Sequence, residues 1–82
     1  MGHFKIVRVK LGLGDTISQL LNDLEGVMNN AVNIGYDSLG TPQIHESSLN
    51  SDNNTIYAYS LMYRHEDSSL TDKEENLKIY NS

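Results

Sequence analysis

The feature that most constrains this chain is an amphipathic pattern over residues 17–31. Apolar residues recur there at intervals of three and four, the spacing that places side chains on one face of a helix. The members of this stripe are Ile17, Leu20, Leu21, Leu24, Val27, Met28 and Ala31. Thr16 and Gln19 have the Thr-x-x-Gln spacing of a capping box, which marks a helix start. We therefore expect a helix over residues 16–30, within which Gly26 is interpreted as a tolerated helical glycine.

The segment before this helix reads as a strand. Residues 4–11 (FKIVRVKL) are rich in β-branched and aromatic types and alternate between apolar and basic side chains. Phe4 and Ile6 fall on the face opposite Val7 and Val9, because successive side chains of a strand point to opposite faces. The strand therefore carries apolar residues on both sides.

Two further strands are expected after the helix. Residues 32–36 alternate between apolar and polar types, and residues 55–65 (TIYAYSLMYRH) are again apolar on both faces. The polar residues 46–54 between them are expected to form a loop. One face of the last strand carries Tyr57, Tyr59, Leu61 and Tyr63.

These elements predict a small α+β domain of β-α-β-β type over residues 1–66, with one helix on a three-stranded sheet. A right-handed crossover would make the first two strands parallel, and the third strand would form a hairpin with the second. Residues 67–82 are expected to be a polar tail or a short helix. Thr71 and Glu74 offer a second capping box for that helix, and its candidate apolar residues are Leu70, Leu77 and Tyr80.

One helix covers only one face of such a sheet, which would leave an apolar patch on the other face. A second copy of the chain is the simplest cover, through a symmetric sheet-to-sheet contact. We therefore expect a homodimer or higher homo-oligomer whose interface includes Tyr57, Tyr59, Leu61 and Tyr63. The alternative is a monomer whose C-terminal segment folds back over that face.

Charge and composition narrow the class of partner. Six Lys and Arg residues against eleven Asp and Glu give a net charge of -5, which argues against direct binding to nucleic acid. An acidic surface can instead meet a basic host or bacterial protein partner, or the mild acidity only maintains solubility. The chain has no cysteine, a composition typical of a reducing compartment, and no segment reads as a signal peptide or membrane span. We expect a cytoplasmic protein that does not contact membranes.

A candidate anion or small-ligand site lies where the first strand leads into the helix. Gly12 and Gly14 precede the expected helix start at Thr16, and Lys10 is close in sequence, so backbone N–H groups and the helix dipole could attract a phosphate. Asp15 places a negative charge where the phosphate would sit, which favours an ordinary turn. The tyrosines offer a second ligand hypothesis, the stacking of a nucleotide base or another flat ring.

No residue pattern indicates catalysis or metal binding. His3, His45 and His65 lack any established spacing of metal ligands, and no serine lies in a nucleophile elbow. We expect no metal, no cofactor and no enzymatic activity.

The succession of strand 4–11, helix 16–30 and strands 32–36 and 55–65 resembles the layout of dodecins and of other small β-α-β-β proteins of bacteria and their phages. Dodecins are flavin-binding oligomers, so the resemblance implies self-association and a flat-ring site. The ring-sandwiching tryptophan of dodecins has no equivalent, since this chain contains no Trp. Short acidic chains of this kind also resemble phage and mobile-element accessory proteins, some of which inhibit host defence enzymes or sequester their nucleotide signals.

Two hypotheses follow. The first is a non-catalytic, self-associating module that engages a protein partner. The second is an oligomer that binds or sequesters a nucleotide or another flat aromatic ligand.

Overall fold

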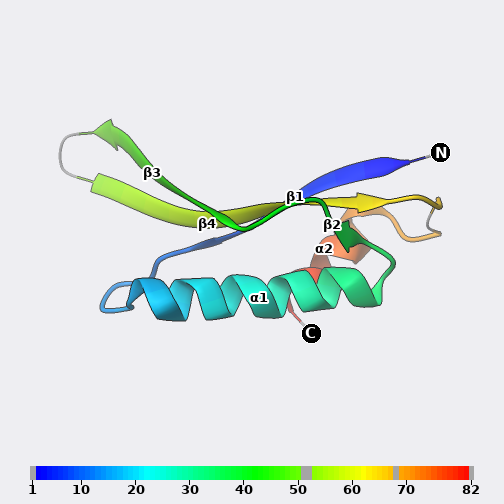
Figure 1. The fold of residues 1–82 in the computed structure, drawn as a ribbon, viewed down its shortest axis with the longest axis horizontal. Helices are drawn as coiled ribbons and strands as arrows, with labels where there is room; N and C mark the ends of the chain where they lie inside the picture. Colours follow the sequence, from blue (N-terminus) through cyan, green and yellow to red (C-terminus); the bar gives the residue numbers. More distant parts are fainter. Residues whose placement is uncertain (1, 51–52, 68, 82) are drawn as a thin grey trace.

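The computed structural model describes residues 2–50, 53–67 and 69–81 and confirms a small α+β domain of β-α-β-β type (Figure 1). Its elements are β1 (His3–Lys10), α1 (Ile17–Asn33), β2 (Asp37–Ser38), β3 (Gln43–Asn50), β4 (Asn53–Arg64) and α2 (Asp72–Tyr80). The sheet has one strand more than expected, because the short β2 precedes β3 along the same side of β4. The optional C-terminal helix is present as α2.

β4 is the central strand of the sheet. β1 pairs with it antiparallel on one side, with His3 opposite Arg64 and Lys10 opposite Tyr57. β2 and β3 pair with it antiparallel on the other side. The expected parallel pairing of the first two strands is not found, because every strand pair of the sheet is antiparallel and β4 lies between β1 and β3. The hairpin is formed by β3 and β4, not by residues 32–36 with the last strand.

The expectation of a strand over residues 32–36 is wrong, because α1 continues to Asn33. The helix ends where Gly35 adopts a φ of +106°, a conformation that favours glycine. The N–H groups of Gly35 and Tyr36 donate to the carbonyls of Val32 and Ala31, which satisfies the last turn. Residues 32–36 alternate between apolar and polar types as a strand does, but they form the last turn of α1 and the glycine turn that ends it. The start of α1 is as expected, with both hydrogen bonds of the Thr16–Gln19 capping box formed.

The expectation of a loop over residues 46–54 is wrong for residues 46–50 and 53–54, because β3 continues to Asn50 and β4 begins at Asn53. Residues 51–52 of that expected loop lie outside the described residues. Among the described residues α1 contacts β1, β2 and β4 but not β3. A strand that no helix covers needs no apolar face, and the sequence of β3 accordingly lacks the apolar alternation by which strands are recognised.

Both helices lie on the same side of the sheet (Figure 1). The core between them and the sheet consists of Val7, Leu20, Leu24, Ala31, Tyr36, Ala58, Met62 and Ile79. β1 contributes Val7 to it and β4 contributes Ala58 and Met62, so the faces predicted for these two strands are confirmed.

α2 packs through a face that differs from the expected one. Glu75 and Ile79 are buried, whereas Leu77 and Tyr80 are more than two-fifths exposed. Its capping box, Thr71 with Glu74, is formed as expected. The Tyr80 hydroxyl accepts a hydrogen bond of 3.2 Å from the Arg8 N–H, on the edge of β1 that faces away from β4. α2 thereby covers part of a strand edge that could otherwise pair with another chain.

In the part of the chain that the structure describes, neither helix is long and apolar enough to cross a lipid bilayer.

Candidate functional site

The face of the sheet turned away from both helices is the first candidate site. The strand register assigns to it Phe4, Ile6, Arg8 and Lys10 of β1 together with Tyr57, Tyr59, Leu61 and Tyr63 of β4. The side chains of Asp37, Gln43 and His45 join them, because these residues pair with Tyr63, Tyr59 and Tyr57. We call this surface the open face. It contains all four of the residues that the sequence predicts for an interface.

One half of the open face is apolar. Phe4 is 62 % exposed, Ile6 61 % and Leu61 41 %, and the Phe4 and Tyr63 rings lie with their centroids 4.8 Å apart. Leu39, whose N–H donates to the Leu61 carbonyl, borders the same half. These side chains place exposed apolar groups on two neighbouring strands of the same sheet face.

The other half of the open face is basic and aromatic. The Arg8 guanidinium lies 5.3 Å from the centre of the Tyr57 ring, within the range of a cation–π contact. Arg8, Tyr57, Tyr59, His45 and Ile6 line a hollow of about 340 Å³. The hollow offers ring faces and one guanidinium, which is the chemistry that suits a flat anionic molecule.

The helices leave the open face uncovered. α2 contacts α1, and its buried residue Ile79 accepts a hydrogen bond of 2.9 Å from the Asn30 amide of α1. The alternative in which the C-terminal segment folds back over the second sheet face is therefore wrong for the described residues 69–81. The C-terminal segment does not reach the open face because α2 packs through Glu75 and Ile79 on the side of the sheet that α1 covers.

A second cluster surrounds the buried carboxylate of Glu75. The Tyr36 hydroxyl donates to both of its oxygens, at 3.1 and 3.2 Å. Arg64 Nη1 lies 3.2 Å from Glu75 Oε2, and Lys5 Nζ lies 3.6 Å from Oε1. Burial and the adjacent Glu75 charge raise the pKa of Tyr36 to about 12. This network ties α2 to β1 and β4 across the interior.

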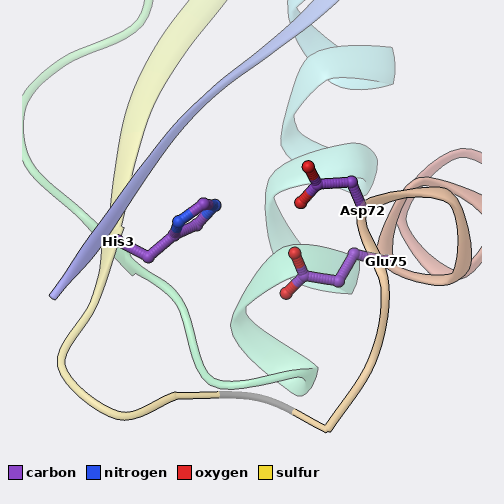
Figure 2. Close-up of side chains that lie close together, drawn as sticks. All are labelled: His3, Asp72 and Glu75. Carbon is purple, nitrogen blue, oxygen red and sulfur yellow. The ribbon is translucent and has the colours of Figure 1, made fainter. Parts of the chain in front are cut away.

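Figure 2 shows His3 facing Asp72 and Glu75 from β1, and ligand atoms of the three residues lie within 4.8 Å of one another. His3 lies some seventy positions before the other two residues, so no motif in the sequence groups the three. They come together because α2 packs beside β1. The positive charges of Arg64 and Lys5 already neutralise Glu75 and oppose a second cation at this place. The cluster is better suited to holding α2 than to holding a metal.

In the candidate anion site at Lys10, Gly12, Gly14 and Thr16, the N–H groups of Gly12 and Thr16 already have acceptors. The Gly12 N–H donates to the Asp15 carboxylate at 3.2 Å, and the Thr16 N–H donates to Gln19 Oε1 at 2.8 Å. Gly14 has a φ of +84°, as a tight turn requires. The Asp15 carboxylate thus occupies the position that an anion would take, and the geometry is that of an ordinary turn.

Comparisons with protein-family models, with curated proteins and with solved structures find no match to this chain.

Proposed function

We propose that the protein is a non-catalytic binding module that self-associates through the open face of its sheet. The observation that carries this proposal is the exposed apolar half of that face, formed by Phe4, Ile6 and Leu61 on two neighbouring strands. The partner is a second copy of the chain, and the acidic surface elsewhere is left to engage a further protein. The absence of cysteine fits a protein of the reducing cytoplasm.

Burial of the exposed apolar side chains supports self-association. Removing apolar surface from water stabilises a complex by roughly 25 cal/mol per Å². Phe4 and Ile6 are each more than three-fifths exposed and Leu61 about two-fifths, so covering them with a second copy would contribute in this way.

The proposal is tested by placing a charge in the middle of the open face. Leu61→Asp introduces a carboxylate that would have to be buried without a partner in the dimer, and it should abolish self-association in native mass spectrometry. Leu77→Asp is the matched control, because Leu77 is 52 % exposed on α2 and lies away from the open face. Wild-type protein that is monomeric, or Leu61→Asp protein that remains dimeric, would refute the proposal.

A second candidate function is the binding of a nucleotide or another flat aromatic anion. The stacking of Arg8 on Tyr57 beside a hollow of about 340 Å³ favours it. The chain contains no tryptophan, so an absorbance band above 300 nm in the purified protein would have to come from a bound molecule. Such a band, lost in Tyr57→Ala protein, would support this function. Adenosine monophosphate and flavin mononucleotide that both fail to bind in calorimetry would count against it.

A further inference from the structure

The open face is electrically polarised along its strands. Arg8 and Lys10 lie toward the end at which β1 finishes, opposite Tyr59 and Tyr57. Asp37 lies at the other end, opposite Tyr63, in the apolar half with Phe4. The face therefore has a basic half and a half that is apolar and acidic, and this division limits how two copies can meet.

Two sheets that pack in the aligned manner keep their strands within about 30° of parallel or antiparallel. A symmetric pair then has its two-fold axis either along the strands or across them. An axis along the strands places Arg8 and Lys10 of both copies in the same half of the interface, where four cations repel one another. An axis across the strands places the basic half of each copy over the apolar and acidic half of the other.

We propose that two copies pack face to face with their β4 strands antiparallel, so that Arg8 and Lys10 of each copy lie over the Asp37 half of its partner. This inference rests on the proposed self-association and adds the orientation of the pair. The Phe4 and Tyr63 rings support it, since they lie in the half that receives the partner's cations and offer ring faces to them. Opposite charges and cation–π contacts then occur twice, once at each end of the interface.

Charge reversal distinguishes the two orientations. Asp37→Lys places a cation in the half that receives the partner's Arg8 and Lys10 in the antiparallel pair, although β2 lies two strands to the side of the partner's β1. At low salt, where charges act over this distance, it should weaken self-association several-fold. In the parallel pair the introduced lysine side chain would lie in the half without Arg8 and Lys10 of either copy, so the dissociation constant would change only as much as that of a variant with the same net charge. Glu25→Lys, on the exposed surface of α1, is the control that changes the net charge by the same amount.

A mixing experiment provides the second arm. The double variant Arg8→Glu with Lys10→Glu should also self-associate weakly, because its acidic half meets Asp37 of its own partner. Mixed with Asp37→Lys protein, it should form heterodimers with an affinity near that of wild-type homodimers, since each end then pairs opposite charges. The rescue should fade in 1 M salt, where the Debye length is about 3 Å. Native mass spectrometry separates the species if one variant is isotopically labelled.

The outcomes for the orientation of the pair differ from the outcomes for self-association itself. If Leu61→Asp dissociates the pair but Asp37→Lys dimerises like Glu25→Lys, the open face is the interface and the antiparallel orientation is refuted. Weakened single variants that fail to form heterodimers on mixing also refute the orientation. If Leu61→Asp leaves the pair intact, or the wild type is monomeric, the interface itself is refuted.

Discussion

At the scale of single residues, Glu75 is the buried charge that most directly links α2 to the sheet in the described part of the chain. It is 1 % exposed and pairs with Arg64, which is 8 % exposed and has a buried Nε without a hydrogen-bond partner among the described residues. Glu75→Gln would remove the buried carboxylate that pairs with Arg64, so it should lower the free energy of unfolding by about 3 kcal/mol. Urea denaturation measures this loss.

Glu25→Gln is the control for this substitution, since Glu25 is an exposed carboxylate of α1 and its replacement should change stability by less than about 0.5 kcal/mol. Equal stabilities for the two variants would show that the Glu75 network does not hold α2 in place.

Tyr36 gives the same network a dependence on alkaline pH. Its pKa is raised to about 12, so the folded state holds the phenol proton more tightly than the unfolded chain, whose tyrosines titrate near 10. The stability that this proton contributes is complete below pH 10 and is lost as the pH rises from 10 to 12. The loss amounts to about 2–3 kcal/mol.

Tyr36→Phe removes this titration, so the difference in unfolding free energy between wild type and variant should shrink over that interval. A constant difference between pH 9 and 12 would contradict the assignment. Below pH 9 the variant should be less stable by about 2 kcal/mol, because Glu75 loses a buried hydrogen-bond donor.

At the scale of elements, a glycine inside α1 and the glycine that follows it should respond oppositely to alanine. Gly26 lies inside the helix, and a Cβ there would meet nothing within 4 Å, so Gly26→Ala should stabilise the protein by about 1 kcal/mol. Gly35 ends the helix with a φ of +106°, which alanine adopts only with strain, so Gly35→Ala should destabilise it by at least about 1 kcal/mol. Thermal unfolding of the two variants side by side tests the pair, and a stabilising Gly35→Ala would show that the helix does not end as described.

The elements also show what the sequence can predict and why it fails elsewhere. Two capping boxes placed both helix starts, since a cap is a local pattern of hydrogen bonds within four residues. The end of α1 was misread because Val32, Ile34 and Tyr36 alternate, while the decisive feature was the single residue Gly35. The polar residues of the hairpin arm of β3 and β4 are predicted as a loop but form strands. Polar composition distinguishes a loop from a strand only where the strand would be covered and would need an apolar face. Alternation detects burial, and no helix covers this arm.

At the scale of the whole molecule, the open face was predictable and the Glu75 network was not. Strands 4–11 and 55–65 carry apolar residues on both sides. Because the sequence predicts one helix to pack on the sheet, one apolar face is expected to stay uncovered. The network joins Lys5, Tyr36, Arg64 and Glu75 from separate segments, and no spacing along the chain connects them. Its one local signal is Glu75, a carboxylate on the same face of α2 as the apolar Ile79.

A self-associating chain should also melt according to its concentration. Binding of a second copy stabilises the folded state by mass action, so the thermal midpoint should rise by about 3–5 °C for each tenfold increase in protein concentration above the dissociation constant. Leu61→Asp should abolish this slope, and Leu77→Asp, at a comparably exposed leucine on α2, should retain it. A wild-type midpoint that stays constant over a hundredfold range of concentration would mean that folding stability does not depend on a second copy. The apolar half of the open face would then be left to a partner other than a second copy of the chain.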